Sequence, residues 1–162
     1  MFQAGRIDLA DTATMIAIRK AEIRDVSGIT HCVNNAYRHY IKRLGKLPGP
    51  MLEDYADIVS QHIVFVAQTG TDIVGVVVLM EHLSPILLDN IAVDPKQQGC
   101  GLGRRLLSLA ENIAGDRGHE SIQLYTHELM YENVDYYSKH GYQISHRISE
   151  KGYQRIYMIK QL

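Results

Sequence analysis

The sequence predicts a mixed α/β fold of the α+β type, in which about four helices flank a sheet of about seven strands. Short runs of apolar and β-branched residues indicate the strands, and apolar residues at helical spacing indicate the helices. Short turns join most neighbouring strands, so we expect a mostly antiparallel meander. The connection between the strands at 86–93 and 121–126 crosses through a helix, which predicts a parallel central pair.

Size and composition indicate an ordinary globular protein. Of the 162 residues, 46% are hydrophobic and 22% are charged. We expect one domain over residues 15–162, preceded by a flexible extension over residues 1–14. A formal net charge of -1 argues against nucleic acid or an anionic membrane as the main partner. Cys32 and Cys100 form neither a zinc motif nor a disulfide framework, so we expect a cytoplasmic protein without a metal site.

The N-terminal half predicts one strand, two helices and a hairpin. Residues 15–21 alternate as a strand, and Asp25 or Ser27 is suited to cap the helix that follows. The glycines and prolines between 45 and 50 break this helix, and a second, shorter helix fits residues 51–61. Strands at 63–68 and 73–81 are joined by a short turn and should therefore pair antiparallel.

The central stretch, residues 86–107, predicts a strand, a glycine-rich turn and a helix in direct succession. The strand at 86–93 ends at an Asp-Pro pair, and an amphipathic helix runs from about residue 102 to Gly118. Between them, glycines occupy every second position: Gly99, Gly101 and Gly103. Free amides at a helix N-terminus beside glycines make a cradle for an anion, most often phosphate. The plainer interpretation is a tight connection that needs small residues, and we favour phosphate binding over it.

The C-terminal part predicts a strand, a helix and a final hairpin. Residues 121–126 form the strand, and a short helix over 130–141 ends at Gly141. Strands at 142–148 and 153–159 turn around residues 150–152.

The glycine loop differs from two well-known phosphate motifs. A P-loop ends in Gly-Lys-Ser/Thr, whereas Arg104 and Arg105 follow Gly103 here. The dinucleotide fingerprint needs a third glycine where this chain has Leu106. Residues 98–103 (QGCGLG) instead resemble the Gln/Arg-x-x-Gly-x-Gly/Ala motif of the GNAT superfamily of acyl-CoA-dependent N-acetyltransferases. This resemblance implies a GNAT-like fold, acetyl-CoA (coenzyme A) as cofactor, and pyrophosphate contacts from Gln98, Gly99, Cys100, Gly101, Leu102, Gly103 and Arg104.

A second segment carries the same resemblance. Residues 137–142 are similar to the family's Tyr-x-x-x-Gly-Phe/Tyr ending, which implies that Tyr137 protonates the departing CoA thiolate. Asn133 lies one turn earlier on the same helix face and is a candidate contact for the pantetheine arm. The family's asparagine and alanine are replaced here by Met130 and Asn133. The alternative for Tyr137 is an ordinary core aromatic.

On the central strand, the resemblance implies that the backbone N–H of Ile91 is the oxyanion donor. It also implies that the backbone of Ile91, Ala92 and Val93 pairs with pantetheine beside a bulge. The glutamate that many members use as a base corresponds to Leu87. Asp89, placed on the face of Ile91 by strand alternation, is a candidate base, as are Glu81 and His82. We interpret Cys100 as a loop residue rather than a nucleophile.

The resemblance assigns the acceptor pocket to the first two helices and their loop. Candidate contacts are therefore Tyr37, Tyr40, Arg43, Met51 and Tyr55, although an aromatic stripe at helical spacing is as often core. We expect an N-acetyltransferase that acts on a small-molecule amine or a protein amino group by direct attack in a ternary complex. The alternatives are a non-catalytic acyl-CoA-binding or sensing module and a structural domain without CoA affinity. A homodimer through the last hairpin is left open.

Overall fold

The structure is a computed structural model that describes residues 15–162; the extension expected over residues 1–14 lies outside them. At its centre is a seven-stranded sheet with the order β1-β2-β3-β4-β5-β7-β6. Among the described strands, β4 and β5 pair parallel and every other neighbouring pair is antiparallel. The predicted fold class is therefore confirmed, including its parallel central pair.

The element bounds follow the predicted segments closely. The strands are β1 (Ala17–Lys20), β2 (Ile63–Thr69), β3 (Asp72–Met80), β4 (Ile86–Val93), β5 (Ser121–His127), β6 (Gln143–Glu150) and β7 (Tyr153–Gln161). The α-helices are α2 (Val26–Tyr37), α3 (Ile41–Leu44), α4 (Tyr55–Gln61), α5 (Leu102–Asp116) and α6 (Tyr131–Lys139). Short 3₁₀ turns include η2 (Arg38–Tyr40), η3 (Gly49–Leu52) and η4 (Pro95–Gln97).

The predicted helix over residues 51–61 is wrong in its first part. Residues 49–52 form the separate turn η3, and α4 begins only at Tyr55. Asp54 causes this start, because its carboxylate accepts hydrogen bonds from the N–H groups of Ala56 (3.1 Å) and Asp57 (3.2 Å). Because η3 is separate from α4, its residues Gly49 and Pro50 can line the site described below.

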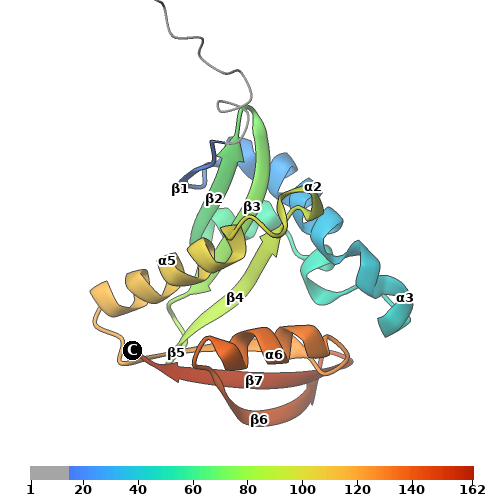
Figure 1. The fold of residues 1–162 in the computed structure, drawn as a ribbon, viewed down its shortest axis with the longest axis vertical. Coiled ribbons are helices and arrows are strands. Elements are labelled where there is room, and N and C mark those ends of the chain that lie inside the picture. Colours follow the sequence, from blue (N-terminus) through green and yellow to red (C-terminus); the bar gives the residue numbers. More distant parts are fainter. Residues whose placement is uncertain (1–14) are drawn as a thin grey trace, which may run out of the picture.

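The helices form two layers, one on each face of the sheet (Figure 1). The buried cluster of one face includes residues of α2 and α4, and the cluster of the other face includes residues of α5. Strand β3 is buried between the layers, and α5 comes close to it at Gly75. A Cβ atom there would lie 3.1 Å from Leu106 Cδ1, so the helix needs a glycine beneath it. Within residues 15–162, no helix is both long and apolar enough to cross a membrane.

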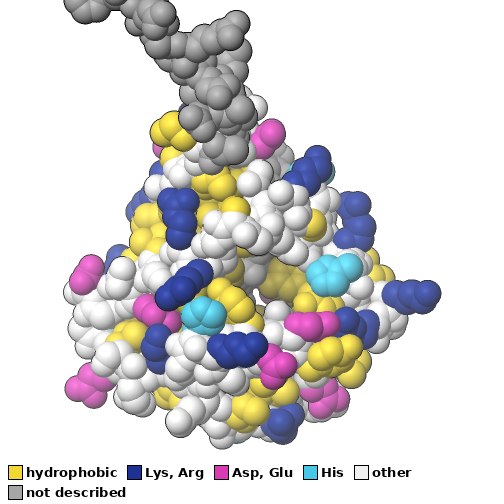
Figure 2. Space-filling model, in the orientation of Figure 1, with side chains coloured by type: hydrophobic (Ala, Val, Ile, Leu, Met, Phe, Trp, Pro, Cys, Tyr) yellow, Lys and Arg dark blue, Asp and Glu magenta, His cyan; other side chains and the backbone are white. Residues whose placement is uncertain are grey.

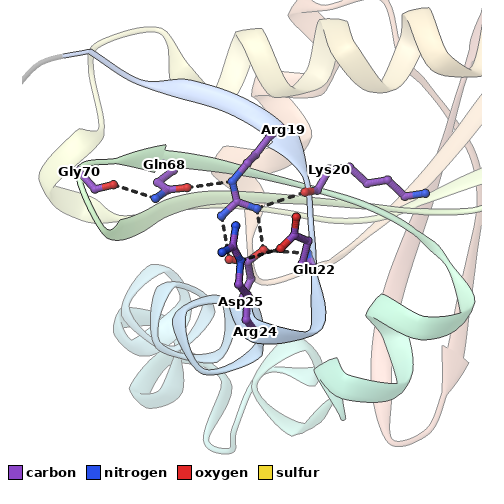
Figure 3. Close-up of polar contacts among 7 residues, drawn as sticks. All are labelled: Arg19, Lys20, Glu22, Arg24, Asp25, Gln68 and Gly70. Atoms are coloured by element: carbon purple, nitrogen blue, oxygen red, sulfur yellow. Dashed lines mark hydrogen bonds and ion pairs between the residues drawn. The ribbon is translucent and has the colours of Figure 1, made fainter.

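A buried ion pair fastens the start of α2 to the sheet edge (Figure 3). The Arg19 guanidinium on β1 donates to both carboxylate oxygens of Asp25, at 2.7 and 2.8 Å, and through Nε to Gln68 of β2 at 2.9 Å. Asp25 is only 7% exposed, and the Arg19 fork lowers the pKa of its carboxyl group. Strand β1, strand β2 and the first turn before α2 are thus held together by one side-chain network.

Strands β4 and β5 are paired only over a short distance. Their parallel register runs over three residues of β4, from Ile86 to Leu88, and the strands then diverge (Figure 1). On its other edge, β4 keeps pairing with β3, where Leu88 lies opposite Leu79 and Asn90 opposite Val78. Asp89 is therefore the extra residue of a β-bulge. From Asp89 onward, the edge of β4 that faces β5 is open.

Candidate functional site

The open edge of β4 presents backbone groups that the sheet does not use. The N–H of Asp94 donates to the carbonyl of Val74 at 2.9 Å, so even-numbered residues at this end of β4 point their backbone groups at β3. The backbone groups of Ile91 and Val93 consequently point into the gap between β4 and β5. In agreement, the carbonyl of Ile91 accepts a hydrogen bond from the Tyr37 hydroxyl at 3.3 Å. Ala92, the residue between Ile91 and Val93, is buried and lies opposite Val76, so its backbone groups face β3.

The glycine loop ends at the N-terminus of α5, next to this edge. Gly99 and Gly101 have φ angles of 85° and 83°, in the left-handed region that favours glycine. The helical hydrogen bonds start with Arg105 N–H to Gly101 C=O (3.1 Å), so the preceding amides have no partner within the helix. A Cβ at Gly103 would meet only Tyr136 Oη at 3.7 Å and Val93 Cγ2 at 3.9 Å. The loop is thus a cradle of free amides with a space above Gly103.

The other loop residues contribute in different ways. Leu102 is only 2% exposed, so its side chain belongs to the core and its backbone alone faces the cradle. The Cys100 thiol turns back to donate to the Gln97 carbonyl at 2.7 Å. Gln98 and Arg104 are exposed and line the hollow over the loop.

Three adjoining hollows connect this loop with the interior. The hollow over the glycine loop shares with the next one the residues Val93, Gln98, Gly103 and Tyr136. That second hollow shares with a third the residues Tyr37, Ile91, Asn133 and Tyr137. We call the third hollow the chamber; it lies in the gap between β4 and β5. Figure 2 shows the opening in the middle of this face, with hydrophobic side chains inside. The result is one groove from the cradle to the chamber.

Tyr137 stands where the second hollow meets the chamber. Its ring packs edge-on against Tyr136 and Tyr142, with centroids 5.4 and 5.7 Å away. Its hydroxyl group has no hydrogen-bond partner in the described part of the chain, and burial raises the pKa of this phenol. It is therefore protonated at neutral pH and free to donate. Asn133, one turn earlier, donates to the Thr126 hydroxyl at 3.3 Å while lining the same junction.

The Asp89 carboxylate lies in the chamber and accepts a hydrogen bond from the Tyr125 hydroxyl at 2.9 Å. Burial raises the pKa of Asp89, against the opposing influence of Tyr125 and Arg155. The expectation that Asp89 shares a face with Ile91 is wrong, because the bulge breaks the alternation. Ile91 packs against the cluster beneath α5, whereas Asp89 turns to Tyr125. Asp89 also interacts electrostatically with five other titratable side chains: it raises the pKa of some of them, and others lower its own pKa. They are Tyr37, Glu53, Tyr55, His62 and Lys151.

Sequence reasoning missed Arg155, which comes from β7 and also lines the chamber. Its guanidinium carbon lies 4.3 Å from the centre of the Tyr125 ring, and its Nη1 donates to Glu150 at 2.9 Å. Tyr125 was missed as well, although alternation along β5 places it opposite the buried Leu124 and Thr126. That alternation was the available signal, but nothing local reveals that β4 and β5 separate at this point.

The acceptor candidates from the first two helices are divided by the structure. Tyr37 lines the chamber, where its hydroxyl donates to Asn90 Oδ1 at 2.7 Å, and Tyr40 lines the second hollow. The other three are not chamber residues. Arg43 forms a fork with the carboxylate of Glu132, Met51 lies in η3, and Tyr55 is buried with its hydroxyl on the Pro50 carbonyl at 2.6 Å.

The alternative bases lie elsewhere. Leu87, at the family's glutamate position, is 5% exposed. Glu81 pairs with Arg117 at 2.5 Å, and the His82 ring lies 5.4 Å from that of His62; neither residue lines the chamber. Over the described residues, no cluster of three or more metal-ligating side chains occurs.

Comparison with solved structures finds the same fold in several acetyltransferases. The PaiA N-acetyltransferase of Thermoplasma acidophilum, solved with coenzyme A, has a TM-score of 0.74 at 18% identity and covers 92% of this chain and 100% of its own. The ribosomal-protein-S18-alanine N-acetyltransferase of Escherichia coli has a TM-score of 0.72 at 19% identity, covering 91% and 94%. YncA of Salmonella typhimurium, described as a putative acetyltransferase and solved with acetyl-CoA, has a TM-score of 0.69 at 18% identity, covering 92% and 95%.

The sequence itself supplies the family assignment. No curated protein matches the sequence significantly. A family model described as an acetyltransferase (GNAT) domain matches residues 60–144, which is more than half of the 162 residues and includes β4, the glycine cradle and α6. The chain therefore belongs to the GNAT family of acetyltransferases.

Proposed function

We propose that the protein transfers an acetyl group from acetyl-CoA to a primary amine, by direct attack of the amine in a ternary complex. The observation that carries this proposal is the continuous groove, which runs from the glycine cradle past Ile91 and Tyr137 into the chamber. A donor entering at one end and an acceptor held at the other would meet beside Tyr137. We assign this activity to a single domain over residues 15–162.

The residues along the groove suit coenzyme A. The free amides before Arg105, with Arg104 beside them, suit its pyrophosphate. The backbone groups of Ile91 and Val93, with which no other strand of the described chain pairs, suit the amides of the pantetheine arm, which would extend the sheet as a strand does. Asn133 and Tyr137 would flank the end of that arm. Bound there, acetyl-CoA supplies an activated acetyl thioester.

Two groups at the junction match the charges that acetyl transfer creates. The N–H of Ile91 points into the gap and is suited to donate to the thioester carbonyl oxygen as negative charge develops on it. The Tyr137 hydroxyl holds a proton and is suited to pass it to the departing sulfur. Both groups belong to ordered elements, β4 and α6, so they are in place before the substrates bind.

Asp89 is the group that we assign as the base. It is the carboxylate that lines the chamber, two residues before Ile91 on β4. An incoming ammonium group would give its proton to this carboxylate and become a neutral nucleophile. Because burial raises the pKa of Asp89 above the value of an ordinary aspartate, it is a stronger base than a surface carboxylate.

The test is Tyr137→Phe, assayed for acetyl-CoA binding and for CoA release with a panel of amines. We expect kcat to fall about 100-fold because the proton donor is lost. Acetyl-CoA should bind as before, since the hydroxyl holds no other residue in the described chain. Tyr131→Phe, which alters an exposed tyrosine on the same helix, is the matched control and should keep wild-type activity.

The buried Leu87 in place of a glutamate favours a second candidate, a module that binds acyl-CoA without turnover. Tight acetyl-CoA binding by the wild-type protein, with no CoA release for any amine in the panel, would establish that candidate instead. Unchanged kcat in Tyr137→Phe would remove the tyrosine from the mechanism.

A further inference from the structure

We propose that the acceptor is a small molecule with a carboxylate close to its amine, such as a free amino acid, and that Arg155 selects it by binding the carboxylate. The inference rests on the proposed acetyl transfer and adds the class of acceptor. Two observations carry it: the chamber is roofed by the chain, and the Arg155 guanidinium has donors inside it that no described carboxylate accepts.

The roof is the segment between α3 and α4, which contains Gly49 and Pro50 of the chamber wall. Contacts with the C-terminal hairpin hold it down. The Tyr153 hydroxyl donates to the Leu47 carbonyl at 2.5 Å, and Lys46 donates to the Gly152 carbonyl. Next to them, Arg43 donates to the Leu129 carbonyl at 3.0 Å. Because the roof is bridged in this way, the chamber is covered on that side, which favours a compact acceptor over the continuing backbone of a protein chain.

Unlike Arg19 and Arg43, Arg155 does not form a forked ion pair with a carboxylate. Arg19 and Arg43 each use both terminal nitrogens on one carboxylate. Arg155 donates to a carboxylate only through Nη1, to Glu150, and a further hydrogen-bonding neighbour is the Tyr157 hydroxyl. Neither Nε nor Nη2 donates to a carboxylate among residues 15–162. Its side chain is nonetheless only 11% exposed. A guanidinium this buried loses most of its hydration, so an anion that takes up the remaining donors would be bound strongly.

The Nη2 side of the guanidinium faces the roof at a glycine. A Cβ atom on Gly49 would lie 3.4 Å from Nη2 of Arg155, so a larger side chain there would cover this nitrogen. Tyr125 fixes the orientation of the cation, because the guanidinium lies over its ring at 4.3 Å. Glu150 holds the opposite edge, and its other contact is the Tyr157 hydroxyl.

The anion and amine positions are close together. The same Tyr125 that carries Arg155 on its ring donates through its hydroxyl to Asp89, at 2.9 Å. The distance from the carboxylate of Asp89 to the guanidinium is therefore about the length of one tyrosine side chain. An acceptor with its ammonium at Asp89, next to Ile91, can place a carboxylate on Arg155 only if a short linker joins the two groups.

The experiment compares free L-amino acids with the corresponding L-amino acid amides, which keep the amine and side chain but lack the charge. CoA release gives kcat/KM, and thermal shifts with CoA present give binding without turnover. We expect a preference of at least 10-fold for the acid of the best pair. The amine of an amino acid amide is less basic than that of the free acid, so a larger share of it is unprotonated at neutral pH. Differences in protonation alone would therefore favour the amide over the acid. Arg155→Gln should lower kcat/KM for the acid at least 10-fold more than for the amide, because any effect on Asp89 is common to both substrates.

Gly49→Val tests the same contact without removing the guanidinium, because the new side chain would cover Nη2. It should lower activity on the acid more than on the amide. Arg147→Gln, an exposed change on the neighbouring strand β6, is the matched control and should have no effect. Equal kcat/KM for acid and amide, equal loss for both in Arg155→Gln, or efficient acetylation of a pentapeptide N-terminus would overturn the inference while leaving acetyl transfer standing. Absence of turnover with every amine, despite acetyl-CoA binding, would instead overturn the proposed function.

Discussion

At the scale of single residues, the extra residue Asp89 in β4 decides what the chamber can do. Under strict alternation along β4, Asp89 and Ile91 would share one face of the sheet; the extra residue separates them, so that Ile91 packs against the cluster beneath α5. The carboxylate of Asp89 meets Tyr125 in the gap between the strands. A glutamate at position 87 is therefore not needed for a base to reach the acceptor.

We predict that Asp89→Asn lowers kcat/KM about 100-fold at neutral pH, because the proton acceptor is lost. The deficit should narrow at high pH, where the acceptor amine loses its proton to solvent. In the wild type, the acidic limb of the pH profile should lie above the value of an ordinary aspartate, since burial raises the pKa of Asp89. Rate profiles from pH 5 to 10 measure both effects.

Asp135→Asn, an exposed change on α6, is the control for the loss of one negative charge. A constant deficit at every pH would contradict the assignment of Asp89 as base.

At the scale of elements, helix α5 combines a structural and a binding function. Its first two turns pack over Gly75 of β3 through Leu102 and Leu106, and the same end of the helix supplies the free amides of the cradle. Besides Gly103 in its first turn, the helix contains Gly115 near its other end, where an added Cβ would have no neighbour within 4 Å. A substitution at Gly115 is therefore a control for the same substitution at Gly103 in the cradle.

We predict that Gly103→Leu abolishes the stabilisation of the protein by acetyl-CoA, because the new side chain fills the space above the cradle. Gly115→Leu, in the same helix, should retain it. Ligand at 100 times its dissociation constant contributes about 2.7 kcal/mol to stability. For a domain of this size, this corresponds to a shift in Tm of roughly 5–10 °C. Equal shifts in both variants would place the cofactor elsewhere.

The same comparison of elements shows what the sequence can predict. The cradle is contiguous: its glycines, strand and helix occur within residues 86–107, so spacing alone reveals it. The chamber is assembled from distant segments, and the roof contact between Tyr153 and Leu47 joins residues 106 positions apart. Residues such as Arg155 acquire their environment only through this packing. The predicted face of Asp89 was wrong for a related reason, because the register shift that reorients its side chain depends on how β3 and β4 pair.

At the scale of the whole molecule, the buried carboxylate of Asp25 and the partly buried carboxylate of Asp89 act on stability in opposite directions. Arg19 lowers the pKa of Asp25, so the charged form stabilises the fold above the pKa of the unfolded state. This contribution is lost as the pH falls through the folded-state pKa. Burial raises the pKa of Asp89, so its charged form destabilises the fold at neutral pH. That cost disappears below the pKa of the unfolded state, where the group is protonated in both states.

We predict that Asp25→Asn destabilises the protein by about 1–3 kcal/mol at pH 7, since it breaks a charged hydrogen-bond network. Its difference from the wild type should shrink as the pH falls toward 3. Asp89→Asn should be more stable than the wild type at pH 7 and equal to it in acid. Urea unfolding of the three proteins at several pH values provides the measurement, and the same sign for both variants would contradict the prediction.

The short pairing between β4 and β5 has a consequence for the order in which the two substrates bind. Within the described sheet, the backbone pairing between strands β1–β4 and strands β5–β7 is limited to three residue pairs of β4 and β5, and the chamber takes its walls from both parts. A cofactor lying along the open edge of β4 would fill the gap between the two parts and complete the wall of the chamber beside Ile91 and Tyr137. We therefore expect compulsory-order kinetics, in which acetyl-CoA associates first and the amine afterwards, and in which the last product to leave is coenzyme A.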